Sequence, residues 1–429
     1  MKSKLQTLMV GLTVIGLVII SCFPAMGKVT TINMWHYWGG IWGEYQQKIT
    51  DMFMEECPEI KVKTLIIPWG DFYPKLLSSI GGGVGPDVAI MDGPWMPTYA
   101  HKGVLMPLDE FIARDRDEIK PEDYYPVTWE ESTYEGKVYG AYYVGGVTGL
   151  FWNKDLFKEV GLNPNIFPQT WKEMDEYSEK LSRMGPREKY ERIGFIPWQN
   201  VWNGFFTWAW INQGKFYDAE TKKITAADPK NVEALEWVVS YGRKYDPEKI
   251  ATFQSGWGEW YTAMNPFIQG ELAMVCMGNW EMTTVRDFAP KMDYGIASMP
   301  ISIEGVRTTG SGGAMGVIPV GSKKIEEAWE FIKWLTINGS DLRAIMCNDQ
   351  PYRWSSFQNP EVTENKKMVE FMKMMPTAKC YPVIPVLQMY IDEVTFAYES
   401  AYRLKKAPKE ALEEVQKKIQ QELDRVLRK

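Results

Sequence analysis

Aromatic side chains beside glycine and polar residues are the most distinctive chemistry-bearing feature of this chain, which has 19 tryptophans among 429 residues. Residues 35–42 read WHYWGGIW and follow a short alternating apolar run, residues 29–34. A core needs large side chains at the strand or helix period, so contiguous aromatics around a glycine pair fit the wall of a binding site better. Flat rings suit the C–H faces of sugars, and nearby carboxylates, amides and guanidinium groups bind hydroxyls.

The same combination of aromatic and polar residues recurs along the chain, mostly where an element is expected to end. The candidate ligand-binding residues are Tyr37, Trp38, Trp42, Trp69, Asp71, Asp92, Trp95, Tyr143, Trp202, Asn203, Trp257, Trp280, Glu281, Tyr352 and Arg353. For any one tryptophan, packing within a lobe is an equally good interpretation, and Trp35, still inside the expected strand, fits either. The repeated polar neighbours favour binding for the set as a whole.

Other chemistry finds little support in the sequence. There are only two histidines, His36 and His101, which argues against His-rich metal sites and most His-dependent triads. The glycine-rich run 81–85 lacks the Lys-Ser/Thr of a phosphate-binding loop and follows a helix. A net charge of −7 disfavours a nucleic-acid partner. No pair of carboxylates is singled out for glycoside hydrolysis, and we expect no cofactor and no metal.

The N-terminus resembles an export signal. Lys2 and Lys4 precede the apolar stretch 8–20, which is too short to span a bilayer comfortably. Residues 19–22 (IISC) resemble a lipobox, in which Cys22 would carry a lipid anchor. Alternatively, a signal peptidase would cut after Gly27, making residues 1–27 a signal peptide. Both alternatives predict an exported protein, periplasmic or at the cell surface, that touches the membrane only through an anchor.

The remaining cysteines are Cys57, Cys276, Cys347 and Cys380, which are widely separated and contain no CxxC pair. This spacing indicates neither a zinc site nor a disulfide scaffold. A Cys347–Cys380 bridge and four buried free thiols are both consistent with it.

The elements that must position these residues alternate in type. Strands are expected at 31–35, 60–67 and 87–91, and helices at 45–56 and 72–80, which together make a βαβαβ unit with a mostly parallel sheet. Further helices are expected at 155–159, 170–184, 229–245, 324–337 and 408–427, with Thr170 as an N-cap. Ligands of open parallel sheets bind beyond the carboxyl ends of the strands. A chain of this length predicts two lobes.

Several segments, in order, resemble the solute-binding proteins of bacterial ABC sugar importers, the maltose-binding-like family 1. They are residues 85–92 (GPDVAIMD), 103–109 (GVLMPLD), 136–140 (GKVYG), 150–157 (LFWNKDLF), 168–174 (PQTWKEM), 267–274 (FIQGELAM), 278–280 (GNW) and 327–335 (EAWEFIKWL). The resemblance covers essentially the whole mature chain.

The resemblance implies an α/β fold with two lobes, mostly parallel central sheets and several hinge crossings around a ligand cleft, as in type II periplasmic binding proteins. It places the lobes at residues 28–140 with 287–340, and at 141–286 with 341–429. It also adds Gly312 and Gly313 to the candidate site, as part of a glycine loop returning to the first lobe. Where the family often has a proline, this chain has Tyr142 and Tyr143.

The function implied is that of an exported, monomeric receptor that captures a sugar and delivers it to the permease subunits of an ABC importer. The number of aromatics favours an oligosaccharide, while a monosaccharide or polyol fits too, and Arg353 and Lys75 leave an anionic sugar open. The alternatives are a secreted carbohydrate-active enzyme and a surface adhesion module. Within this interpretation, WHYWGGIW forms the strand-end wall of a sugar cleft.

Overall fold

The computed structural model of the protein describes residues 29–199 and 203–428. Within them, seven strands form the principal sheet, in the order β11-β6-β13-β3-β1-β2, with β12 also paired to β6. These strands are β1 (Thr30–His36), β2 (Ile60–Ile66), β3 (Val88–Asp92), β6 (Ala141–Asn153), β11 (Met274–Gly278), β12 (Tyr294–Ala297) and β13 (Ser311–Val317). Three small hairpins pair β4 (Thr133–Tyr134) with β5 (Lys137–Val138), β7 (Arg183–Met184) with β8 (Tyr190–Arg192), and β9 (Tyr217–Asp218) with β10 (Lys223–Ile224).

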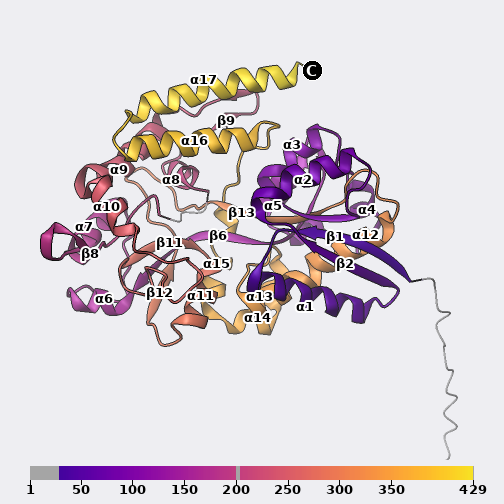
Figure 1. The fold of residues 1–429 in the computed structure, drawn as a ribbon, viewed down its shortest axis with the longest axis horizontal. Coiled ribbons are helices and arrows are strands. Elements are labelled where there is room, and N and C mark those ends of the chain that lie inside the picture. The colour runs from indigo at the N-terminus through magenta and orange to yellow at the C-terminus, as the bar shows by residue number, and fades with distance from the viewer. Residues whose placement is uncertain (1–28, 200–202, 429) are drawn as a thin grey trace, which may run out of the picture.

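Helices surround the sheet on both sides (Figure 1). They are α1 (Gly40–Glu56), α2 (Trp69–Gly81), α3 (Met96–His101), α4 (Asp109–Arg114), α5 (Pro126–Ser132), α6 (Lys154–Glu159), α7 (Trp171–Leu181), α8 (Phe205–Ile211), α9 (Pro229–Tyr245), α10 (Pro247–Gln254), α11 (Glu281–Phe288), α12 (Ile325–Trp334), α13 (Ser340–Cys347), α14 (Pro360–Glu364), α15 (Lys366–Met372), α16 (Leu387–Tyr402) and α17 (Pro408–Leu427). None of the described helices combines the length and apolar character needed to cross a membrane.

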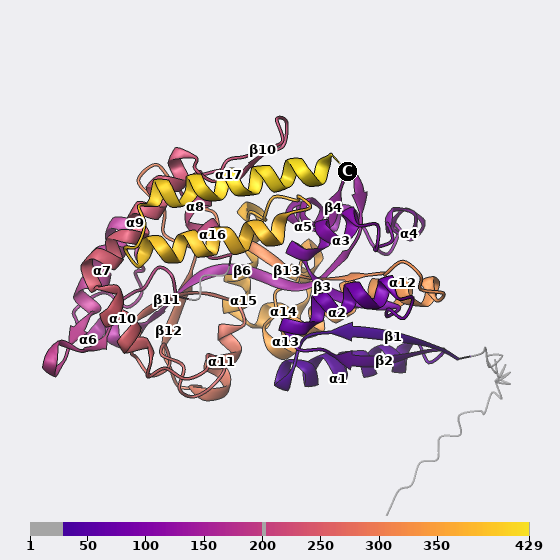
Figure 2. The same cartoon turned by 45° about the horizontal axis from the view of Figure 1, so that its top comes forward.

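The two-lobed α/β fold is confirmed, and strand β6 is what joins its halves. Residues 141–147 of β6 pair with β13, which continues to β3, β1 and β2, whereas residues 148–153 pair with β11 and β12. One strand therefore belongs to both halves, and Figures 1 and 2 show it running between them.

The direction of the strands corrects one detail of the expectation. β1 runs parallel to β2 and β3, as the βαβαβ pattern predicts. The pairings of β13 with β3 and β6, and of β6 with β11 and β12, are antiparallel. The sheet is mixed because β6 and β13 carry the chain between the halves in opposite directions, which places them antiparallel to each other.

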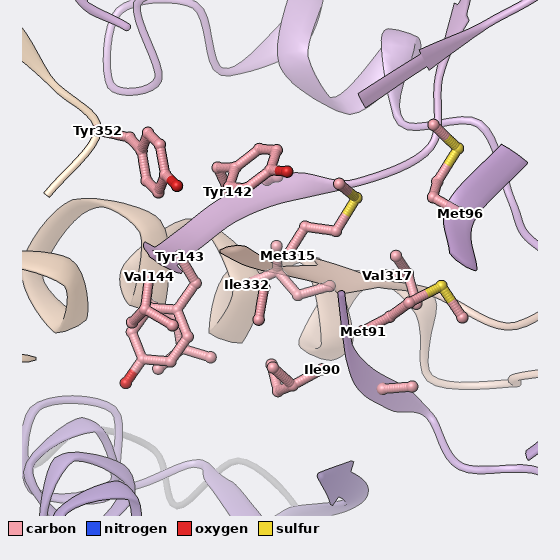
Figure 3. Packing of buried hydrophobic residues seen from close by; sticks show 14 of the residues in the cluster. Ile90, Met91, Met96, Tyr142, Tyr143, Val144, Met315, Val317, Ile332 and Tyr352 are labelled. Carbon is pink, nitrogen blue, oxygen red and sulfur yellow. The ribbon is translucent and has the colours of Figure 1, made fainter. Parts of the chain in front are cut away.

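The buried apolar side chains form two clusters, of which the first lies mostly in the β1–β3 half and also includes Val275 and Met277 of β11. The first surrounds Ile32, Ile90 and Val317, and Figure 3 shows the part of it around β3, β6, β13 and α12. The second packs α7, α8, α9, α16 and α17 together around side chains such as Trp208. On α17, Leu412, Val415, Ile419 and Leu423 form an apolar stripe that is buried in this second cluster.

Local signals fix several element ends. Thr170 caps α7 by accepting a hydrogen bond from the Glu173 backbone N–H, and the Glu173 carboxylate reaches back to the N–H of Gln169. Asp228 caps α9, which begins at Pro229. The four described cysteines are free thiols, three of them buried, so the chain adopts the free-thiol alternative.

Candidate functional site

A cavity of about 280 Å³ opens where strands β1 and β3 end, beside the crossing strands. Its lining residues are Tyr37, Trp38, Trp42, Asp92, Val144, Gly145, Trp280, Gly313, Ala314, Arg343 and Asp349. The carboxyl ends of β1 and β3 supply one wall, and the glycine-rich stretch of β6 and β13 a second. The rest comes from α1, from the residue that precedes α11, and from α13 with the residues that follow it. This is where open sheets of this kind place ligands.

A second chamber of about 170 Å³ adjoins the first, because Asp92 and Gly313 line both. Its other lining residues are Trp69, Pro94, Trp95, Asn203, Gly312, Tyr381, Gln388 and Ile391. The two chambers together form the cleft. Asp92 stands at their junction, at the C-terminal end of β3.

The Asp92 carboxylate is held by two tyrosines. The Tyr37 hydroxyl donates a short hydrogen bond to it, and the Asp92 backbone N–H donates to the Tyr73 hydroxyl at 2.9 Å. Burial raises the pKa of Asp92 to about 7, and the hydrogen bonds with both tyrosines oppose that rise. The site thus contains a carboxyl group that changes charge near neutral pH.

Arg343 is the cation of the cavity wall, and its environment fixes it in place. Its Nε donates to the Asp349 carboxylate at 2.7 Å, and its Nη2 makes a short bond to the same oxygen. The guanidinium also lies 4.5 Å from the centre of the Trp38 ring and 6.0 Å from that of Tyr143. A charged group held by a carboxylate and by aromatic faces forms a stable part of the wall.

Trp280 enters the cavity from the second half of the sheet. It follows β11 at the start of α11, and its ring lies directly over Gly278, where an added Cβ would come within 2.0 Å of it. The indole therefore leaves no room for a side chain at position 278, which accounts for the glycine there. The Trp280 side chain is partly exposed, so ring surface remains available to the cavity.

The glycines of the crossing strands have a packing role of their own. A Cβ on Gly313 would lie 2.1 Å from the Val144 carbonyl oxygen, and one on Gly145 would lie 2.1 Å from the Tyr352 hydroxyl. These glycines let β6, β13 and Tyr352 approach closely. Because these glycines have no side chains, this wall also projects less far into the cleft.

Most of the predicted site residues lie around the cleft. Those that line it are Tyr37, Trp38, Trp42, Trp69, Asp92, Trp95, Asn203, Trp280, Gly312 and Gly313.

The structure places the other predicted residues behind the wall or away from it. Tyr143 is buried and donates to Gln46, while the Tyr352 hydroxyl donates to the Gly312 carbonyl. Neighbours Tyr142 and Tyr143 lie on opposite sides of β6 (Figure 3), with Tyr142 against Tyr352. Tyr143 and Tyr352 therefore support the wall from behind and are not part of its surface.

Four further predicted residues lie elsewhere. Glu281 is buried and accepts from Asn265, and burial raises its pKa to about 8. Arg353 pairs with Asp341 at 3.2 Å. Trp257 packs beside Phe253. Asp71 is exposed on α2, and Trp202 lies outside the described residues.

The sequence interpretation missed Arg343, Asp349 and the small residues Val144, Gly145 and Ala314 of the wall. Arg343 and Asp349 lie about 300 residues after Trp38 in the chain, and neither has an aromatic neighbour in sequence. Arg343 lies on α13, a helix that the sequence analysis did not predict, so no local pattern indicated that it faces a cavity.

Among the described residues, no group of His, Cys, Asp and Glu side chains could hold a metal ion. The polar groups of the cleft are two carboxyl groups, a guanidinium, two amides and hydroxyls. These groups, set among indole rings, can bind an uncharged, hydroxyl-rich ligand by hydrogen bonding and stacking.

Comparison with known proteins identifies the family. The model of the bacterial extracellular solute-binding proteins matches residues 42–340. The chain belongs to this family. Its members are extracellular binding proteins, and the chain is accordingly an exported protein of that kind.

Individual relatives are similar to this chain over most of its length. The chain is 26% identical over 399 residues to the arabinooligosaccharide-binding protein of Bacillus subtilis, covering 87% of this chain and 86% of that protein. It is 24% identical over 386 residues to the maltotriose-binding protein of Pyrococcus abyssi, covering 88% and 78%. The solved structure of CpMnBP1 with mannotriose bound superposes with a TM-score of 0.80 at 25% identity, covering 90% of this chain and 99% of that one.

Proposed function

We propose that this protein captures a sugar in the cleft and delivers it to the membrane permease of an ABC importer. The observation that carries the proposal is the cavity itself, in which Trp38, Trp42 and Trp280 accompany Asp92 and Arg343. Indole faces and hydrogen-bonding groups with both donors and acceptors are what a sugar ring requires. The relatives that bind arabino-oligosaccharides, maltotriose and mannotriose support the same class of ligand.

We infer further that the ligand is an oligosaccharide. The two chambers meet at Asp92 and Gly313, and each has its own tryptophans: Trp280 and Trp38 in one, Trp69 and Trp95 in the other. Two adjacent sugar rings would each find an aromatic face. A monosaccharide or polyol would fill only the larger chamber.

We propose that ligand closes the two lobes on each other. Closure by hinge rotation is general among periplasmic binding proteins, and the Trp38 and Trp280 rings come from opposite halves of the sheet. Ligand drives closure only through tighter binding to the closed form. Small-angle scattering should give a smaller radius of gyration at saturating sugar, and identical profiles would contradict the mechanism.

Our proposal also includes the lobe boundaries and the way in which the N-terminus is processed during export. We assign residues 28–140 with 287–340 to one lobe and 141–286 with 341–429 to the other. The packing of α13 against α1 favours counting α13 with the first. Cys22 as a lipid anchor, or cleavage after Gly27, would both deliver a monomeric receptor outside the cytoplasm.

A thermal-shift screen over sugars, followed by calorimetry, tests the proposal. A ligand at 100 times its dissociation constant should add about 2.7 kcal/mol to the free energy of unfolding. Chromatography after prolonged incubation should recover the sugar unchanged. Cleavage products would favour a carbohydrate-active enzyme instead, and binding only to insoluble polysaccharide would favour an adhesion module.

A further inference from the structure

Arg343 has one hydrogen-bonding nitrogen that the described residues leave without a partner. Its Nε and Nη2 both donate to Asp349, but its Nη1 finds no acceptor, although the side chain is only 1% exposed. Buried guanidinium N–H groups are normally satisfied, because leaving one unpaired costs stability. Since Arg343 lines the larger chamber, an acceptor supplied by a ligand is the simplest way to complete it.

The surroundings of Arg343 keep this donor in place before ligand arrives. Asp349 fixes one edge of the planar guanidinium, and the Trp38 ring lies 4.5 Å from its centre. The side chain cannot turn toward solvent without losing both contacts. A donor held in this way binds with little further loss of conformational freedom.

The positive charge of Arg343 is already paired without a ligand. The positive charge of Arg343 faces the Asp349 carboxylate, and the other ionisable acid in the lining is Asp92. His36, which lies behind Trp38, adds no positive charge at neutral pH, because burial and the Arg343 charge lower its pKa to about 4. Among the described lining residues Arg343 is the only cation, and Asp349 already pairs with it, so an anionic ligand would meet no unpaired positive charge.

We propose that Arg343 donates from Nη1 to an uncharged oxygen of the bound sugar, and that the cleft selects neutral sugars over uronates. The inference rests on the proposed function, since it specifies the ligand class of the same cleft. Asp349 then acts as a positioning residue that orients the guanidinium. A hydroxyl or ring oxygen of the sugar accepts the hydrogen bond from Nη1, and the same sugar ring stacks on a neighbouring indole.

Calorimetry on the full mature chain tests both parts, with mannobiose, mannotriose, maltotriose and arabinotriose as neutral probes and dimannuronate and digalacturonate as anionic ones. Arg343→Met should weaken binding of the best neutral probe at least tenfold. Arg343→Lys should recover only part of the loss, because an ammonium lacks the planar fork. Arg114→Met is the matched control: Arg114 also lies over an aromatic ring, that of Phe111 at 5.3 Å, and pairs with Asp115, but on α4 away from the cleft.

Removing Arg343 alone leaves the Asp349 carboxylate buried and unpaired, so the double variant Arg343→Gln with Asp349→Asn is measured as well. It removes both charges together, and circular dichroism confirms its fold. We expect the same tenfold loss for neutral sugar. Full affinity in this folded variant, or uronate binding as tight as that of the neutral probe in the wild type, would overturn the inference. If none of the neutral probes binds the wild type, the proposed function falls, and this inference with it.

Discussion

Two groups of tryptophans lie in this molecule under contrasting physical conditions. In the second core, Trp208 is fully buried and donates from Nε1 to the Pro197 carbonyl at 2.8 Å, beside Trp171 and Trp237, which stack at 4.3 Å. In the cleft, Trp38, Trp42 and Trp280 keep part of their rings exposed beside carboxylates.

The difference teaches that sequence neighbours alone do not separate binding aromatics from core aromatics. Trp198 has Gln199 and Asn200 next to it, as a binding residue would, yet its ring stacks on Tyr402 at 4.3 Å. What distinguishes the cleft tryptophans is ring surface left uncovered next to polar groups. The two groups should therefore respond differently to substitution, in stability for one and in affinity for the other.

The largest expected effect is on the core group. Trp208→Ala removes a fully buried indole and should lower the free energy of unfolding by about 3–5 kcal/mol. Urea denaturation monitored by circular dichroism measures it. The folded fraction should bind sugar with unchanged affinity, and near-normal stability would contradict the assignment of this tryptophan to the core.

Trp280→Ala should show the opposite profile. Truncating a stacked aromatic at a recognition site typically costs at least about 2 kcal/mol of binding, more than tenfold in affinity. The melting temperature should fall less than in Trp208→Ala, because the Trp280 ring is partly exposed. If affinity is unchanged in a normally folded variant, Trp280 does not belong to the site.

The pH dependence of the free energy of unfolding gives a finer test of the cleft, through its carboxyl group on Asp92. Burial raises the folded-state pKa of Asp92 to about 7, above the ordinary value of 3.8, so folding favours its protonated form. Its stabilising contribution is present below about pH 4 and is lost as pH rises through 7. The free energy of unfolding of the unliganded protein should decline over this range.

Asp92→Asn should flatten part of that decline, as measured by urea denaturation at several pH values. A residual slope should remain from Glu131 and Glu281, because burial raises the pKa of each to about 8. A variant whose slope equals that of the wild type would show that Asp92 titrates normally.

The smallest effect concerns the rim of the cleft. Trp69 is 50% exposed, and its ring contacts Tyr37 and Tyr73 edge-on in the smaller chamber. Trp69→Ala should cost less than about 1 kcal/mol of binding for a trisaccharide, as rim contacts usually do. Calorimetry with a monosaccharide and a trisaccharide should place the loss on the longer ligand alone; an equal loss on both would contradict the two-chamber interpretation.

Much of the fold was predictable because its signals are local. The bounds of α17 match the predicted range 408–427, since Pro408 begins the helix and its apolar stripe has a clear helical period. Helix α9 matches for similar reasons. The strands β1 to β3 were predictable as a parallel unit because helices separate them.

The rest depended on contacts between distant segments. Arg343 meets Trp38 only because α13 packs against α1, and no pattern within either segment encodes that meeting. The face on which Tyr142 or Tyr143 lies depends on the register of β6 against β13, which shifts between Ala314 and Met315. The site was therefore predictable where an aromatic residue stands beside glycine or polar residues in sequence. It was not predictable where a distant helix or a small strand residue completes the wall.

The shared strand has a consequence for how the molecule can be cut. The chain passes between the two halves three times: along β6, between β12 and β13, and again between α12 and α16. A protease that cleaves once, in any exposed loop, leaves at least one covalent crossing and the paired strands intact. No single cleavage separates the two halves, so a receptor that is cleaved once would remain one particle with its cleft intact.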